Sequence, residues 1–98
     1  MKLTINNKVV PVEIMDTPEK ISTGMMGRDS LDGGMLFLFD KADERSFWMK
    51  NCLIPLDIIF ITGNKITKVH KNCEPCTTEP CKSYTGFADK VLELASRR

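Results

Sequence analysis

Apolar and polar residues alternate along several short segments of the chain, which is the pattern of strands with one buried face. Residues 3–5 and 10–14 alternate in this way, and the polar residues 6–8 between them are typical of a turn. We therefore predict an N-terminal hairpin with Val12 facing inward. Pro11 favours a sheet edge, because proline has no N–H to donate to a neighbouring strand.

Two other segments, residues 35–39 and 57–61, are apolar at nearly every position and predict strands buried on both faces. Residues 46–50 alternate again, so that Phe47 and Met49 share one face, which we expect to point to the core, while Trp48 and Lys50 share the other. Between them, the charged residues 40–45 are expected to form a connection. Further strands are predicted at residues 66–71 and 90–94.

One helix is predicted near residues 17–27. Residues 16–19, Asp-Thr-Pro-Glu, supply a capping side chain, a proline at an early helical position and an acid in the first turn. Gly24 weakens the helix, so it should be short. Arg28 would follow the helix either on the surface or leaning inward, where a buried charge needs a partner such as Asp57.

These elements show no βαβ rhythm and no repeats. They predict a mainly-β fold: one compact β-sandwich or partly closed barrel, jelly-roll-like, of about seven strands with one short helix. The 98 residues are enough for one domain, residues 1–98.

Composition changes this picture little. Fourteen Lys and Arg residues against thirteen Asp and Glu residues leave a net charge of +1, so no overall field favours nucleic acid or a membrane as a partner. No segment has the roughly 20 apolar residues of a membrane-spanning helix. The first residues also lack the apolar segment of a secretory signal, so we expect a cytoplasmic location.

Several short motifs follow one another along the chain, from about residue 8 to residue 94. They are residues 24–28 (GMMGR), 34–37 (GMLF), 47–51 (FWMKN), 55–57 (PLD), the Pro-Cys pairs at 75–76 and 80–81, Tyr84 and residues 91–94 (VLEL). This set resembles the small bacterial, archaeal and phage domains of domain-of-unknown-function family 192 (DUF192), also called uncharacterised protein family 0127. The resemblance implies a mainly-β sandwich or barrel with a helix near its start, and it implies no biochemical activity. Many family members carry a secretory signal, so a trimmed signal is the alternative to a cytoplasmic location.

The four cysteines allow more than one arrangement. The family pattern includes Cys76 and Cys81, whereas Cys52 and Cys73 stand where it would have Thr and a small apolar residue. A Cys76–Cys81 disulfide would fasten the long loop expected at residues 72–89 and contribute about 2 kcal/mol. A Cys52–Cys73 bridge is a further possibility, although disulfides are uncommon in a reducing cytosol.

Zinc is the alternative use of these residues, and otherwise no cofactor is expected. One imidazole and three thiolates, from His70, Cys73, Cys76 and Cys81, could complete a tetrahedral site. Residues 73–76 also have the C-x-x-C spacing of redox proteins, but no helix is predicted after Cys73, as such a motif requires.

A second group of polar and aromatic residues could bind a ligand. An aromatic platform beside amide, cationic and carboxylate groups suits a small polar or sugar-like molecule. The candidates are Arg28, Trp48, Lys50, Asn51, Asp57, Thr78, Glu79 and Tyr84. The structural alternative is that Trp48 covers one face of the core and that Arg28 and Asp57 form a buried pair.

The most economical interpretation is a non-enzymatic ligand-binding or accessory module with its pocket near Trp48 and the Cys76–Cys81 loop. No nucleophile–base pair, Gly-x-Ser-x-Gly elbow or phosphate-binding loop is present in the sequence, and no catalytic residue is predicted. The alternatives are a metal- or thiol-dependent protein using His70, Cys73, Cys76 and Cys81, and a protein-interaction module using an exposed sheet edge.

Overall fold

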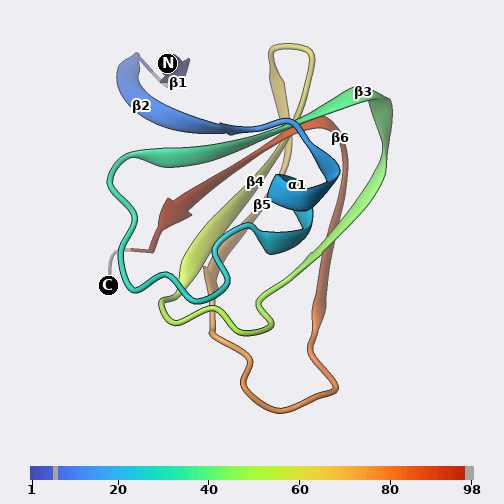
Figure 1. Cartoon of the computed structure of the whole chain (residues 1–98). Coiled ribbons are helices and arrows are strands. Elements are labelled where there is room, and N and C mark those ends of the chain that lie inside the picture. The colour runs from blue at the N-terminus through green and yellow to red at the C-terminus, as the bar shows by residue number, and fades with distance from the viewer. Residues whose placement is uncertain (6, 97–98) are drawn as a thin grey trace.

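A computed structural model describes residues 1–5 and 7–96 (Figure 1). These residues form six strands in one mixed sheet and one short helix. The elements are β1 (Lys2–Ile5), β2 (Lys8–Met15), α1 (Pro18–Thr23), β3 (Gly34–Trp48), β4 (Leu56–Thr62), β5 (Lys65–Cys73) and β6 (Ser83–Ala95). Asn6 of the predicted turn, and residues 97 and 98 of the predicted domain, lie outside the described residues. Within the described part, no helix is long and apolar enough to cross a bilayer.

The strands lie in the order β1-β2-β3-β6-β4-β5, with β2 and β3 parallel and all other neighbours antiparallel. The mainly-β prediction and the N-terminal hairpin are confirmed, but the sheet does not close and has six strands instead of seven. Pro11 pairs with Lys2 of β1, and β2 meets β3 only from Val12 onward. Pro11 thus has a strand neighbour on one side only, as its missing N–H requires.

The difference in strand number comes from β3, where two predicted strands are one strand of 15 residues. The charged residues 40–45, expected to form a connection, continue the strand through a register shift between Leu38 and Asp43. Both halves pair with β6, the second from Asp43 opposite Ala88 to Trp48 opposite Ser83. The prediction was wrong because charged side chains are compatible with a strand when they point to solvent and the backbone still pairs with a neighbouring strand.

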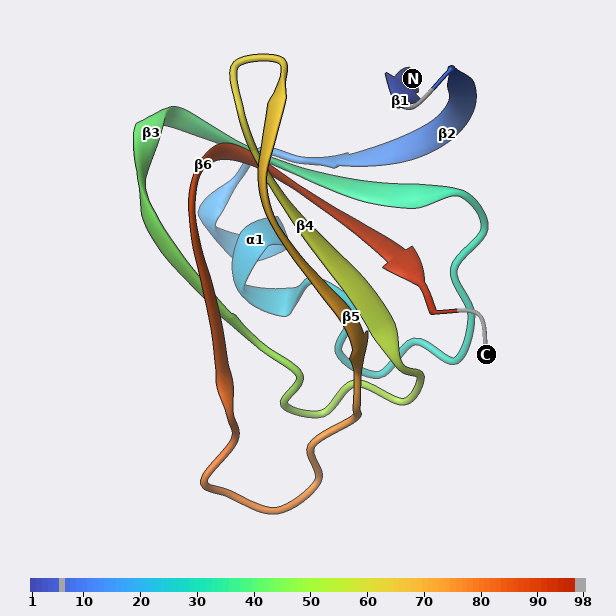
Figure 2. The ribbon, with the colours of Figure 1, turned by 180° about the vertical axis from the view of Figure 1, so that it is seen from behind.

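Strands β3 and β6 bend together, so that the second half of each leaves the plane of the first (Figures 1 and 2). Gly86 lies in the bent part of β6, where an added Cβ would stand 2.5 Å from Cγ of the buried Phe60. Strand β6 begins at Ser83 and β5 ends at Cys73, so the long loop expected at residues 72–89 is shorter in the structure.

The sheet buries apolar side chains on both faces, as the two apolar segments predicted. The larger cluster includes Met35, Phe37, Ile58, Phe60 and Val91, and Ile21 of α1 packs against it. The smaller cluster, on the other face, includes Val12, Leu36, Ile59, Ile61 and Leu92. Alternation along each strand therefore separates odd and even positions between two cores.

Helix α1 confirms the prediction near residues 17–27 but is shorter. The hydroxyl of Thr17 accepts a hydrogen bond from the Lys20 backbone N–H at 3.2 Å, and Pro18 opens the helix. Gly24 ends it with φ of 45°, a conformation that residues with a Cβ rarely adopt. Gly24 also lies against the ring of Phe37, so the end of α1 is fixed over the larger cluster.

Candidate functional site

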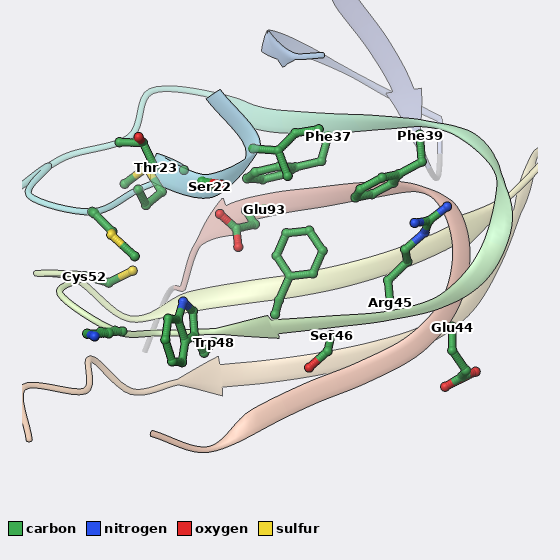
Figure 3. A pocket seen from close by; sticks show the side chains of 16 residues that line it. Ser22, Thr23, Phe37, Phe39, Glu44, Arg45, Ser46, Trp48, Cys52 and Glu93 are labelled. Carbon is green, nitrogen blue, oxygen red and sulfur yellow. The ribbon is translucent and has the colours of Figure 1, made fainter. Parts of the chain in front are cut away.

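A pocket of about 380 Å³ lies between α1 and the bent strand β3 (Figure 3). Helix α1 and the turn after it contribute Ile21, Ser22, Thr23, Gly24, Met25 and Met26. Both halves of β3 contribute as well, with Phe37 and Phe39 before the bend and residues 44–48 after it. Lys50, Cys52 and Glu93 complete the lining. The volume is in the range of small-molecule sites.

Aromatic rings join the two halves of β3 across the pocket. The Phe37 and Phe47 rings meet edge to face with centroids 4.9 Å apart, and Phe39 and Phe47 do so at 6.3 Å. The Arg45 guanidinium stacks 4.1 Å from the centroid of Phe39. Its Nε donates to the Ala88 carbonyl at 3.3 Å and its Nη2 to the Lys41 carbonyl at 2.5 Å. Arg45 is therefore held in place by backbone and ring contacts.

The polar group most deeply enclosed in the pocket is Glu93, on β6, the third strand from the β5 edge. Its side chain is only 4% exposed. The register places Glu93 between Met35 of β3 and Ile58 of β4, both 0% exposed. Figure 3 shows its carboxyl group among the side chains of the pocket. A carboxyl group on a central strand, with apolar neighbours on both sides, is an uncommon arrangement.

Burial alone raises the pKa of Glu93 to about 8. Across residues 1–5 and 7–96, no cation or hydrogen-bond donor contributes to that shift. Desolvation is the sole cause of the shift, so no hydrogen bond from this part of the chain stabilises the carboxylate, and Glu93 lines the pocket. Glu93 is thus a buried acid whose hydrogen-bonding capacity is open to a ligand.

Trp48 and Lys50, two of the predicted ligand-binding residues, form the rim of this pocket. Trp48 is 44% exposed, and the Lys50 ammonium lies 5.0 Å from the centroid of its ring. Lys50 Nζ also pairs with Glu79 Oε1 at 2.9 Å. Phe47 and Met49 point to the core as predicted, since Met49 is fully buried and Phe47 packs against the larger cluster.

The Cys76–Cys81 disulfide is present and belongs to a loop that docks on the rim. The Cys76 N–H donates to the Met49 carbonyl and the Asn51 N–H to the Cys76 carbonyl, both at 3.1 Å. Asn51 itself has φ of 59°, which asparagine tolerates better than most residues. Of the residues predicted to bind a ligand, Asn51 has this structural role and does not line the pocket.

Arg28 and Asp57 lie elsewhere and do not form the buried pair that was one alternative for them; Arg28 lies on the surface, which was the other alternative. Arg28 forms a two-pronged pair with Glu13, at 2.6 Å and 2.9 Å, on the surface. Asp57 accepts a hydrogen bond from the Asn72 N–H at 3.0 Å. Because Asp57 precedes Ile58, which faces the same side as Glu93, alternation turns its side chain to the opposite face of the sheet.

The two remaining candidates are also outside the pocket. Thr78 is exposed in the disulfide loop. Tyr84 packs edge to face on His70, with ring centroids 5.3 Å apart. The Lys82 ammonium lies over the Tyr84 ring, 5.1 Å from its centroid. The structure thus brings together Trp48 and Lys50, and Glu79 through its ion pair, out of the eight residues proposed.

Cys52 and Cys73 are free and buried, so the second disulfide considered as a possibility does not form. The backbone of Cys52 forms an isolated β-bridge with Met26, after α1, whereas Cys73 ends β5 opposite Leu56, and both side chains belong to the larger cluster. Burial, with a smaller contribution from the Glu93 charge, raises the pKa of Cys52 to about 11. Burial also raises the pKa of Cys73. Neither environment is that of a reactive thiolate.

The four residues considered for zinc are not gathered around one point. Cys76 and Cys81 are bonded to each other, and the His70 Nε2 lies 2.9 Å from the Thr85 carbonyl. In the described part of the chain, no three His, Cys, Asp or Glu side chains converge as metal ligands do.

Sequence reasoning missed Glu93, Arg45 and the apolar wall of Met25, Met26 and Phe39. A signal for Glu93 was present: in residues 91–94 the acid occupies a position that alternation assigns to the same face as Val91. For Arg45 there was none, because its position depends on the bend of β3.

The family model of DUF192, described as an uncharacterized ACR family, matches residues 1–98. The chain belongs to this family. Two solved structures resemble it over 97% of its length. One is a protein from Sinorhizobium meliloti proposed to be a transcription regulator, with a TM-score of 0.82 and 29% identity, of which the match covers 77%. The other is a protein of unknown function from Novosphingobium aromaticivorans, with a TM-score of 0.80 and 31% identity, of which 71% is covered. No curated protein matches this DUF192 domain.

Proposed function

We propose that this DUF192 domain is a non-enzymatic small-molecule-binding module whose site is the pocket between α1 and the bent strand β3. The observation that carries the proposal is a single enclosed carboxyl group, Glu93, without a partner in the described chain, in a concave site with aromatic and methionine walls. Ligand sites typically combine an apolar lining with a few such polar groups.

The proposal shifts the site from the one expected from sequence. Trp48 and Lys50 remain at the rim, but the ligand would enter between Met25, Met26 and Phe39 instead of lying against Arg28 and Asp57. A ligand with an apolar body fits this lining better than a sugar, which needs hydrogen-bonding partners around its ring.

Methionine methyl NMR tests the proposal directly. Met25 and Met26 line the pocket, whereas Met1 and Met15 do not and serve as internal references. With ¹³C-methyl methionine and a library of small aromatic and aliphatic compounds, we expect saturable shifts of Met25 and Met26 methyl resonances. Their absence across the whole library would refute the proposal.

A matched pair of variants on α1 locates the binding. Ser22→Trp adds bulk at a pocket-lining position, and Glu19→Trp adds the same side chain to α1 outside the lining. We expect Ser22→Trp to weaken binding at least about tenfold, because it occupies pocket volume, and Glu19→Trp to leave it unchanged. Equal effects of the two variants would place the binding outside this pocket.

The name of the Sinorhizobium relative does not lead us to propose DNA binding here. Chain charge is nearly balanced, at +1, and the helix in the described part has six residues and packs its Ile21 into the core. Recognition of the major groove typically uses an exposed helix or β-ribbon with a cluster of basic residues.

A further inference from the structure

The charged groups that line the pocket differ in whether they already have a partner within the described chain. Arg45 is bound to two carbonyl oxygens and stacked on Phe39, and Lys50 is paired with Glu79. Both cations of the lining are therefore engaged with other groups. Glu93 is the enclosed acid that the described chain leaves unpaired.

The groups near Glu93 come from each element around it. Glu44 and Arg45 of β3 line the pocket, as do Lys50 and Cys52 after that strand, and Ser22 and Thr23 of α1 add only neutral hydroxyl groups. Cys73, at the end of β5, is close enough for the Glu93 charge to affect its pKa. Met35 and Ile58, the sheet neighbours of Glu93, have no charge.

We infer that the pocket takes primary amines with an apolar body, and that the ligand ammonium pairs with the carboxylate of Glu93. This inference rests on the proposed function and specifies its ligand class. An ammonium group has three donors and no acceptor, so the Glu93 carboxylate matches it as an acceptor, and Ser22 and Thr23 add neutral hydroxyl groups to the lining. The apolar body then lies against Phe39, Met25 and Met26.

Binding requires Glu93 to lose its proton. In the empty pocket at pH 7 the neutral acid exceeds the carboxylate by about tenfold, a preference that one charge-assisted hydrogen bond offsets. The proton passes to solvent while the amine remains protonated, so close to one proton is released for each ligand bound. Affinity then rises about tenfold per pH unit up to pH 8 and levels off above it.

Three probes of the same shape test this inference: phenethylamine, 2-phenylethanol and 3-phenylpropionate. We expect the amine to bind at least about tenfold more tightly than the alcohol at pH 8 by calorimetry. In buffers of different ionisation enthalpy at pH 7, the amine should release close to one proton and the alcohol none.

Two charge-matched variants complete the test. Glu93→Gln keeps the shape of the side chain and should remove the advantage of the amine while leaving alcohol binding within about twofold. Asp29→Asn removes one negative charge from an exposed position and should change neither. Should Glu93→Gln not fold, the proton release and pH profile of the unaltered protein decide the question.

The outcomes separate this inference from the proposed function. Equal binding of amine and alcohol in the pocket would overturn the amine assignment and leave the small-molecule site standing. Tighter binding of the carboxylate would overturn it as well and point to Lys50 or Arg45. Failure of all three probes, together with unchanged Met25 and Met26 resonances across the library, would overturn both.

Discussion

Glu93 is an ionisable residue at a position where its neighbours are apolar. Strand β6 needs an inward side chain at this position, and Met35 and Ile58 beside it provide no polar partner. The fold encloses an acid where an apolar residue would be more stable. Its pKa of about 8 is the physical consequence, because the neutral form is the one that burial tolerates.

A pH dependence of stability follows from this pKa. The folded state binds the Glu93 proton more tightly than the unfolded chain does, so stability is greatest below the unfolded pKa and falls as pH rises toward 8. We expect urea denaturation to show a loss of up to about 1.4 kcal/mol per pH unit between pH 5 and pH 8. Glu93→Gln should flatten this slope and be the more stable protein at pH 8. An unchanged slope in Glu93→Gln would assign the dependence to another group.

At the scale of single residues, the sequence predicted which face of a strand a side chain occupies better than it predicted which charged residues form ion pairs. Alternation correctly assigned Phe47 and Met49 to the core face and Trp48 to the opposite face, because that depends only on the strand period. The alternative that paired Arg28 with Asp57 does not hold, because Arg28 pairs with Glu13, 15 residues away, and strand alternation carries no information on such a contact.

At the scale of elements, the bend of β3 and β6 creates the site. The bend lets one strand supply both walls of the pocket, and Gly86 permits β6 to follow it by leaving room for Phe60. Composition could not predict this, since the charged residues 40–45 resemble a loop. The disulfide was predictable, because two cysteines five residues apart need no long-range contact to meet.

Replacement of Gly86 tests the close approach. Gly86→Ala places a Cβ 2.5 Å from Phe60 Cγ, so we expect a loss of about 1–3 kcal/mol in unfolding free energy. Thr85→Ala, at the exposed neighbouring position, should change stability by no more than about 0.5 kcal/mol. Combining Gly86→Ala with Phe60→Leu should cost less than the two single changes together, and strict additivity would argue against this contact.

The disulfide loop offers a second test at this scale. Replacing Cys76 and Cys81 together by Ser should lower the unfolding free energy by about 2 kcal/mol, because the unfolded chain regains the freedom of the closed loop. Chemical denaturation of the oxidised protein and the double variant measures the difference. The matched control is Cys52→Ala, which leaves the disulfide intact. Unchanged stability of the double variant would show that the backbone hydrogen bonds with residues 49–51 hold the loop in place without the disulfide.

The whole molecule is an open sheet, and an open sheet has edges. In the described chain the strand order ends at β1 on one side and at β5 on the other. Strand β5 exposes Ile66 and Val69, but Lys65, Lys68 and Lys71 lie along the same edge. Lysine on an edge strand opposes pairing with a second sheet. The sequence predicted the mainly-β class from local alternation, whereas strand order depends on distant pairings that a pattern does not encode.

Removing this protection should promote association. We expect Lys65→Thr/Lys68→Thr to self-associate with rising concentration in light scattering, because threonine favours strands and removes the charge. Lys20→Thr/Lys41→Thr changes the net charge by the same amount away from β5 and should behave as the unaltered protein does. Association of both variants alike would make net charge the cause.

The alkylation rate of Cys52 can report how often the pocket opens. The thiol lines the pocket, and its raised pKa keeps it unreactive until the structure opens. The rate at which an alkylating reagent modifies Cys52 therefore measures how often the space beneath α1 opens to solvent. A molecule seated there should slow that rate in proportion to its occupancy, so a change in mass of the intact protein over time would report binding without any added label.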